Sequence, residues 1–487
     1  MQRPSFHQRP ALALAALAVL VLGLAPACSS ANDPAPLAGS LAGRDVILIV
    51  ADALHAHHLG AHGYQRPTSP TIDHLALTGT LFADASSQTS WTVSSVASLF
   101  TSLEQERHGL LYANQHLAPD ASTLAELFQD GGYRTAAMIQ NGILWSRRDQ
   151  PDWPGTRLCR GFDSYEMFPD MDRVQQELDR LLTRAREVVL EEERPPLFAY
   201  IHLLPPHEPY TPPAGFRDRF DPDYAGPVDG SLDSSLRVAL SHEGFDQPED
   251  LAHLVALYDE HLAYLDAELG RFLTELWAAR PDSLVIFTSD HGEAFREHRN
   301  LGHGSQVHEE MVHVPLILSA PQSPLPQGRV CGSPTSLLDV LPTLVELCGL
   351  PQARQTPRGL SLVPLLAEPL TTPAAFEERG LLFTSRYKAA HPEQLNIALR
   401  QGSYKLLRHW KDQRDALYNV AADPLETDDI SGQRPELARA LGRALEDAYR
   451  ASTRDVVGDD QAAPGTIPQD VLDNLHKMGY LGEDGGD

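Results

Sequence analysis

The stretch Asp45–Val50 reads DVILIV, a short apolar run rich in β-branched residues, and Asp52 follows two positions later. Continuous apolar runs of this length are typical of strands buried on both faces, as in parallel sheets covered by helices. A carboxylate that follows such a strand stands at its carboxyl end, where open α/β sheets bind their ligands. This stretch therefore predicts a central parallel strand with a site beside it.

The rest of the first 370 residues alternates strands with helices. We expect further strands at Thr135–Ile139, Leu197–Leu203 and Ser283–Thr288. We expect helices at Thr123–Asp130, 251–273 and Val340–Leu347. In the first, Thr123 and Glu126 have capping-box spacing, and in the second, leucines recur every three or four residues. This alternation predicts an α/β fold with a mostly parallel central sheet flanked by helices.

The pattern changes after about residue 370. Leu381–Ser385 and Leu395–Arg408 alternate apolar with polar residues, and Gln401-Gly402 offers a hairpin turn. We therefore expect a small antiparallel C-terminal subdomain. The predicted organisation is a catalytic α/β domain at 44–370, a C-terminal α+β subdomain at 371–450 and a tail at 451–487.

The N-terminus has the pattern of an export signal. Arg3 and Arg9 precede the apolar run Ala11–Ala25, which is shorter than the roughly 18 residues of a spanning helix. Small residues before Cys28 indicate a bacterial lipobox, so we predict a signal peptide at 1–27, a lipid anchor on Cys28 and a linker at 28–43. Plain secretion and an uncleaved anchor are the alternatives. The protein is thus expected in the periplasm or at the cell surface, attached to the membrane.

The composition excludes some partners and raises one question. Lys and Arg number 39 against 66 Asp and Glu, a net charge of -27, which argues against nucleic acid as a partner. Four cysteines in 487 residues do not form a disulfide scaffold. Ten of the 21 histidines fall in two windows, His55–His74 and His291–His313. Histidine is a common metal ligand and acid–base residue, so these windows are candidate sites.

Polar residues follow several of the expected strands. Asp52 follows the first, Asn141 follows Thr135–Ile139, His202 and His207 lie at and beyond the third, and Asp290 and His291 follow Ser283–Thr288. The carboxyl ends of parallel strands meet at one edge of the sheet. An Asp-His pair there offers the oxygen and nitrogen ligands that zinc or manganese takes.

A nucleophile is expected in Ser90–Ser102 (SWTVSSVASLFTS), ahead of an apolar helix. An anionic oxygen bound at this helix N-terminus would meet free backbone N–H groups. Thr92 is the preferred nucleophile. The alternative is that Thr92 only caps the helix and that Ser90 or Ser95 attacks. In either case the hydroxyl needs a base or a metal to ionise.

Together these motifs resemble the sulfatases of the alkaline-phosphatase superfamily, over about residues 44–485. Each motif is weak alone, but their order makes the resemblance specific. The matching segments are Asp45–Tyr64, Pro67–Phe82, Ser90–Ser102, His202–Tyr210 (HLLPPHEPY), Thr288–Glu293 (TSDHGE), Gly302–Gly304, Met311–Leu316, Ser336–Leu350, Gly402–Leu407 and Ala416–Thr427.

Four positions depart from the family pattern. Thr92 stands where sulfatases have the Cys or Ser that becomes formylglycine, and Val96 where they have an Arg. The β-methyl of Thr blocks that conversion, so no formylglycine is expected. Ala53 replaces a second Asp, and Gln140 stands at a frequent Lys position. Losing a carboxylate weakens a calcium site, so Mn²⁺ or Zn²⁺ is favoured over Ca²⁺. The remaining set resembles phospho-group transferases and phosphonate or phosphodiester hydrolases of the superfamily.

The resemblance implies a metal-dependent hydrolase or transferase of small anionic esters, with a lipid or glycan head group among the candidate substrates. It implies one divalent metal held by Asp52, Thr92, Asp290 and His291, catalysis by Thr92, His207 and His303, and substrate binding by Asn141, His207 and His303. The alternatives are a sulfuric ester hydrolase without formylglycine and a non-catalytic binding lipoprotein of the same fold. We interpret the first histidine window as mainly structural.

Overall fold

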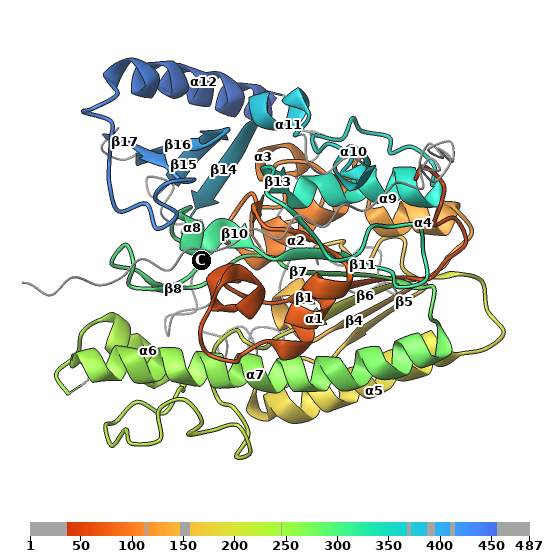
Figure 1. Ribbon diagram of the computed structural model, residues 1–487, viewed down its shortest axis with the longest axis horizontal. Coiled ribbons are helices and arrows are strands. Elements are labelled where there is room, and N and C mark those ends of the chain that lie inside the picture. The colour runs from red at the N-terminus through yellow and green to blue at the C-terminus, as the bar shows by residue number, and fades with distance from the viewer. Residues whose placement is uncertain are drawn as a thin grey trace, which may run out of the picture. The chain divides into compact units, whose positions relative to one another are not determined.

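The computed structural model describes residues 37–112, 115–146, 156–244, 246–367, 372–386, 395–409 and 414–454. Its main feature is an eight-stranded sheet in the order β12-β2-β11-β7-β1-β6-β4-β5 (Figure 1). Only β11 runs antiparallel to its neighbours in this sheet. The strands are β1 Val46–Ala51, β2 Thr80–Phe82, β4 Arg134–Ile139, β5 Ser164–Met167, β6 Leu197–Leu203, β7 Leu284–Ser289, β11 Leu316–Ser319 and β12 Arg329–Cys331.

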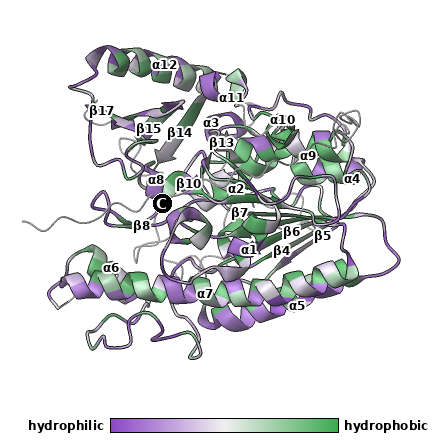
Figure 2. Ribbon diagram, in the orientation of Figure 1, coloured by the Kyte–Doolittle hydropathy of each residue, from purple (hydrophilic) through white to green (hydrophobic). Residues whose placement is uncertain are grey.

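Helices cover both faces of this sheet. Successive side chains of β1 enter opposite cores, because a strand presents alternate residues to its two faces. Val46, Leu48 and Val50 pack with α2 (Thr92–Thr101), α4 (Leu124–Asp130) and α9 (Val340–Cys348). The intervening residues pack with α1 (Pro70–Thr78), α5 (Val174–Leu190) and α7 (Pro248–Ala279). Figure 2 shows hydrophobic strands between helices of mixed character. The predicted α/β fold is confirmed.

The C-terminal part is a second, antiparallel sheet. It consists of β14 Gly380–Arg386, β15 Leu395–Gln401, β16 Tyr404–His409 and β17 Arg414–Asn419, in that order. Helix α12 (Pro435–Arg454) covers one face through Leu441 and Leu445. The other face packs on Val307 and Val312 of the main part. The expected antiparallel sheet and its hairpin at Gln401-Gly402 are therefore present.

Shorter elements complete the described residues. The strands are β3 Ala85–Ser86, β8 Ala294–Phe295, β9 Leu301–Gly302, β10 His313–Val314 and β13 Thr335–Ser336. The α-helices are α3 Gln105–His108, α6 Leu232–Ala239, α8 Glu309–Val312, α10 Val363–Ala367 and α11 Ala374–Glu378. The 3₁₀ turns are η1 Ala56–His58, η2 Gly60–His62, η3 Gly142–Leu144, η4 Met171–Arg173 and η5 Leu337–Asp339.

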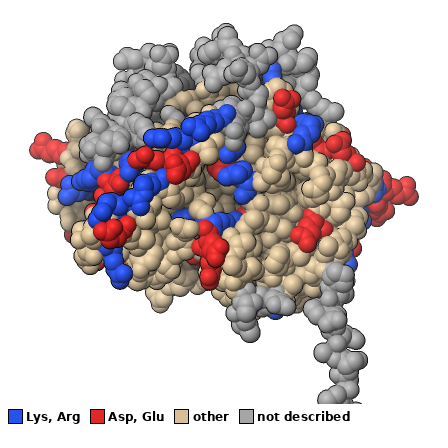
Figure 3. Space-filling view, turned by 90° about the horizontal axis from the view of Figure 1, so that it is seen from above, with Lys and Arg blue, Asp and Glu red and all other residues tan. Residues whose placement is uncertain are grey.

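Most expected elements form within one or two residues of their predicted bounds, and the helix at 251–273 is longer, running from Pro248 to Ala279. Leu37 and Leu41, at the end of the predicted linker, are buried in the main core. The predicted signal peptide, Cys28 and nearly all of the 451–487 tail lie outside the described residues, so these remain predictions, as do the domain boundaries. Among the described helices, none is long and apolar enough to span a membrane. Acidic and basic side chains are interspersed on the face shown in Figure 3.

Candidate active site

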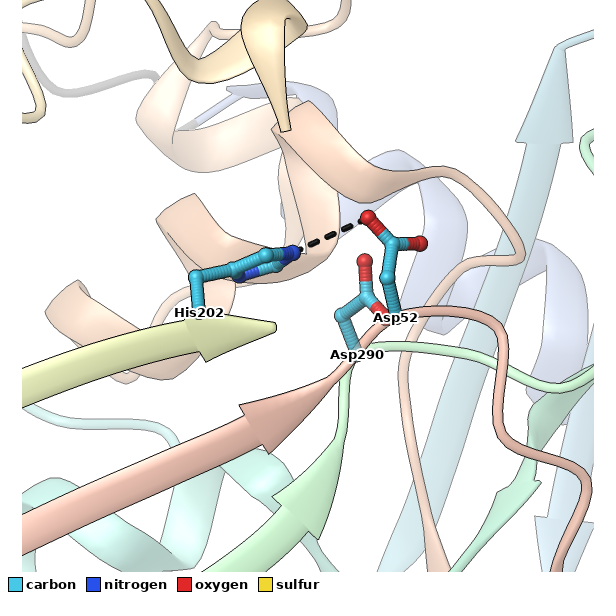
Figure 4. Close-up of side chains that lie close together, drawn as sticks. All are labelled: Asp52, His202 and Asp290. Atoms are coloured by element: carbon cyan, nitrogen blue, oxygen red, sulfur yellow. Dashed lines mark hydrogen bonds and ion pairs between the residues drawn. The ribbon is translucent and has the colours of Figure 1, made fainter. Parts of the chain in front are cut away.

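Three adjacent strands bring a group of buried side chains together at their carboxyl ends. Asp52 follows β1, His202 is the penultimate residue of β6, and Asp290 follows β7 (Figure 4). Strand β1 pairs in parallel with both β6 and β7, so the three strand ends lie side by side. One ligand atom from each residue lies within 4.8 Å of the others. The edge of the sheet that the sequence indicated is therefore the candidate site.

Asp52 is held in place through one of its two carboxylate oxygens. Its Oδ2 accepts hydrogen bonds from Nε2 of His202 at 2.9 Å and from the side-chain amide of Asn141. The Tyr200 hydroxyl lies 2.7 Å from Nδ1 of His202 and orients that ring. The other oxygen, Oδ1, is buried and has no hydrogen-bond partner. Buried oxygens of this kind normally have a partner, so Oδ1 is a candidate ligand atom.

Asp290 repeats this asymmetry. Its Oδ1 accepts from the backbone N–H of His291 at 3.0 Å and of Ala53 at 3.3 Å, whereas its buried Oδ2 has no hydrogen-bond partner. The unpartnered oxygens of Asp290 and Asp52 lie 3.5 Å and 3.7 Å from Nε2 of His291. Nδ1 of His291 lies 2.9 Å from the Gly292 carbonyl, to which it donates, so Nε2 carries the lone pair. Two carboxylate oxygens and one imidazole nitrogen therefore converge, a donor set that fits manganese or zinc.

Thr92 lies beside this convergence. It is the first residue of α2, it is fully buried, and its Oγ1 is 3.2 Å from Nε2 of His291. The two alternative nucleophiles are engaged elsewhere: Ser95 Oγ donates to the Asp290 carbonyl at 2.5 Å, and Ser90 Oγ to the Gln306 carbonyl at 2.6 Å. Of the three candidate nucleophiles, only Thr92 has its hydroxyl beside a side-chain ligand atom of the candidate metal site.

Two further histidines complete the site. The ring centroid of His303 lies 4.4 Å from that of His291 and 4.8 Å from that of His207. Nδ1 of His303 is 3.0 Å from Glu293 Oε1, and the Tyr210 hydroxyl donates to Oε2 of the same carboxylate at 3.0 Å. Nδ1 of His207 is 2.6 Å from the Glu208 carbonyl. All of these histidines are predicted site residues, and the structure brings them together.

Burial and mutual charge shift the pKa values of the whole group. Burial raises the pKa of Asp52, but the charges of His207 and the hydrogen-bonded His202 outweigh it and lower that pKa well below its usual range. Burial lowers the pKa of His303 to about 4, helped by repulsion from His207. For His207 burial acts downward, yet Asp52 and two glutamates raise its pKa. Burial raises the pKa of Glu293 to about 7.

The sequence prediction of the site lacks two neighbours that the structure supplies. His202 lies at a predicted strand end but is not among the predicted site residues, and Glu293, which holds His303, enters the sequence analysis only within the TSDHGE motif. The signal for His202 was available: as the penultimate residue of a fully buried strand, its imidazole required a polar partner. Gln140 and Val96, which stand at the Lys and Arg positions of the family pattern, make packing or backbone contacts in the interior. The Gln140 amide bonds two backbone groups, and Val96 is in the core.

Comparison with known proteins identifies the family to which the chain belongs. Residues 44–350 match the family described as "Sulfatase". The chain belongs to the sulfatase family. Residues 298–450 of this sulfatase-family protein also match the family described as "N-sulphoglucosamine sulphohydrolase, C-terminal". The chain is therefore a member of a family of hydrolases, built on the superfamily fold that the sequence predicted.

Similar curated proteins carry sulfatase names. The chain is 30% identical over 259 residues to the choline-sulfatase of Rhizobium meliloti (strain 1021), a match that covers 50% of this chain and 47% of the relative. It thus spans about half of that protein's length. It is 22% identical to the uncharacterized sulfatase YidJ of Escherichia coli (strain K12), over 71% of this chain and 74% of the relative.

Solved structures with the same fold include enzymes of phosphorus chemistry. The phosphonate monoester hydrolase of Agrobacterium radiobacter superposes with a TM-score of 0.70 at 22% identity, covering 84% of this chain and 96% of that one. BT4656 in complex with its substrate D-glucosamine-2-N,6-O-disulfate gives a TM-score of 0.67 at 18% identity, covering 86% and 99%. At these identities the likeness shows the fold.

Proposed function

We propose that this sulfatase-family protein is a metal-dependent hydrolase of small anionic esters that uses the Thr92 hydroxyl as its nucleophile, with phosphodiesters or phosphonate monoesters as substrates. One observation carries the proposal: Thr92 Oγ1 lies 3.2 Å from His291 Nε2, next to two buried carboxylate oxygens without hydrogen-bond partners. A non-catalytic protein would have no reason to keep such groups together, because unpartnered buried oxygens cost stability.

The metal would be held by Asp52, Asp290, His291 and Thr92, and the residues present fit it. Each carboxylate has one oxygen engaged by hydrogen bonds and one without a partner, and the oxygens without a partner lie within 4 Å of His291 Nε2. When bound, such a metal would lower the pKa of the Thr92 hydroxyl and offset the negative charge of the ester. His202 and Asn141 would position Asp52 for it.

The chain's own groups then account for the remaining chemistry. Thr92 Oγ1 attacks phosphorus, so that a P–O bond to Thr92 forms as the bond to the leaving oxygen breaks. The N–H groups in the first turn of α2 stabilise the non-bridging oxygens. His207, whose pKa is raised, delivers a proton to the leaving oxygen, and His303 binds the non-bridging oxygens. The proton that Thr92 releases on attack passes to water. Water then attacks the Thr92 ester at phosphorus and returns a proton to His207, and the departing Thr92 oxygen takes a proton from water.

The charge of the site favours a monoanionic substrate. Val96 and Gln140 replace the Arg and Lys of the family pattern, and both lie in the protein interior with packing or backbone contacts. With less cationic help, a dianionic phosphate monoester is disfavoured relative to a monoanionic phosphodiester or phosphonate monoester. The name of the Agrobacterium relative, a phosphonate monoester hydrolase, agrees with this class.

The second candidate function is sulfate ester hydrolysis without formylglycine. Sulfate esters are also monoanionic, and the curated relatives are named choline-sulfatase and arylsulfatase. The family match supports this reading as well. Only the substrate assay distinguishes the two.

The test is a panel of p-nitrophenyl phosphate, phosphodiester, phosphonate and sulfate, assayed after chelation and on return of Mn²⁺, Zn²⁺ or Ca²⁺. We expect turnover of the diester and phosphonate that chelation abolishes. Thr92→Ala should lower kcat by at least about 10³-fold, and Thr92→Ser should retain part of the activity. Thr101→Ala, at the far end of the same helix, is the matched control. Full turnover by Thr92→Ala on every substrate of the wild type would refute the proposal.

A further inference from the structure

The two histidine windows of the sequence meet in space through residues that the candidate catalytic group does not include. His57 and His62 belong to the 3₁₀ turns η1 and η2 that follow β1, whereas His313 begins β10. The ring centroid of His313 lies 5.0 Å from that of His57 and 5.3 Å from that of His62. The sequence separates these residues by about 250 positions, so only the fold makes them a cluster.

Two ring separations, those of His57 and His62 from His313, suit a shared metal ion. Zn–N bonds of about 2.0–2.1 Å and tetrahedral angles put the centroids of two ligating imidazoles about 5 Å apart. Both observed separations have this value, and the ring planes meet at 73° and 79°, so the rings are not stacked against each other. Stacking would have closed off the space between them.

The hydrogen bonds of the cluster leave nitrogen lone pairs for a ligand. Nε2 of His313 lies 2.9 Å from the Ala83 carbonyl, to which it donates, so Nδ1 carries the lone pair. A backbone carbonyl that holds the second ring nitrogen is the usual support of a metal-ligating histidine. Nε2 of His62 is buried and has no hydrogen-bond partner.

A cavity gives access to the cluster. His57 and His62 line a space of about 700 Å³, together with Tyr64, Arg66 and Phe295. Both histidines are partly exposed on their short turns. Among the described residues, only Asp52, His202 and Asp290 already have ligand atoms within 4.8 Å of one another. The nitrogens of His57, His62 and His313 are therefore not yet that close together, and metal binding would turn the His57 and His62 rings toward His313.

We propose that His57, His62 and His313 bind a second transition-metal ion of the zinc class, with the remaining coordination position open to the cavity. This assignment departs from the structural interpretation of the first window. It does not rest on the proposed catalytic function, because the cluster shares no residue with the Thr92 site. The ion would tie the loop after β1 to β10, and thereby stabilise the loop by mass action.

The experiment measures zinc and cobalt binding to the full chain after chelation. We expect the wild-type chain to bind two Zn²⁺ ions and Asp290→Asn to bind one. When His62→Ala and His313→Ala are added to Asp290→Asn, we expect no tightly bound Zn²⁺. His62→Ala alone should lower the affinity of the second site at least about tenfold and leave the activity of the Thr92 site unchanged. His74→Ala, an exposed histidine of the same window, is the matched control.

Cobalt provides a readout that a structural role would not change. Co²⁺ bound by imidazoles in tetrahedral geometry has intense visible absorption, which Asp290→Asn should keep and His62→Ala in that background should lose. One ion per wild-type chain that Asp290→Asn removes, or two ions in His62→Ala with unchanged affinity, would overturn the proposal. Far-UV circular dichroism checks the fold, and His62→Gln replaces any alanine variant that fails to fold.

Discussion

Lys405 carries a buried charge that joins the C-terminal sheet to helix α8 of the main part, and replacing it tests the energetics directly. Its ammonium group on β16 is fully buried, 2.7 Å from Glu309 Oε1 and 3.1 Å from Glu426 Oε1. Both carboxylates are buried as well. Lys405→Met keeps most of the length of the side chain and removes the charge. Two negative groups would then remain in the interior with no cation between them.

The size of the effect follows from the pKa of Glu426. Burial raises this pKa, but the ammonium of Lys405 and the contact with His308 outweigh burial and lower the pKa from 4.5 to about 2. Such a difference corresponds to about 3 kcal/mol of favourable interaction. Removing one partner of a buried ion pair costs about 3–5 kcal/mol in general. We therefore expect Lys405→Met to lower the free energy of unfolding by about 3–5 kcal/mol.

The assay is urea unfolding followed by tryptophan fluorescence, at about pH 7 and about pH 5. The folded pKa of Glu426 lies below its unfolded value, so its contribution is present above about pH 4.5 and is lost as the pH falls toward 2. In the variant both carboxylates are desolvated without a cation, which raises their pKa values, so the destabilisation should shrink toward about pH 5. Arg439→Met, which breaks the exposed pair with Glu436, is the control and should cost less than about 1 kcal/mol. A Lys405→Met cost below about 1 kcal/mol, or one that grows on acidification, would refute the reasoning.

Three further changes test the core and the site. Phe198→Ala, which removes a fully buried ring stacked on Phe128, should cost about 3–5 kcal/mol in a chemical unfolding experiment, and an intact midpoint would contradict the assigned core. Asn141→Ala should weaken metal binding at the catalytic site about 10–100-fold in a calorimetric titration, because Asp52 loses an orienting hydrogen bond; equal affinity would remove Asn141 from the site. Burial raises the pKa of Asp266 to about 6, so the contribution of this group to stability should fall by about 3 kcal/mol as the pH rises from about 3 to about 7, and Asp266→Asn should remove this slope.

The elements of the fold were predictable from local pattern. The run at β6 matches its predicted bounds Leu197–Leu203, and the helix with the capping box begins where Thr123 and Glu126 indicated. These signals are local, because a strand buried on both faces needs a continuous apolar run and a helix start needs a cap. The start of α7 was not predictable, because its first turn, from Pro248 to Asp250, is polar and carries no apolar stripe.

The amino-acid sequence by itself determined the edge of the sheet at which Asp52, Asp290 and His291 stand, and the order of motifs that led to Thr92. It could do so because each residue follows its own strand or begins its own helix. Only the tertiary structure decided which oxygen of each carboxylate lacks a partner, that His202 orients Asp52, and that Glu293 holds His303. It also decided that His313 meets His57 and His62. Such contacts depend on strand register and side-chain direction across the sheet, and no local pattern in the chain records them.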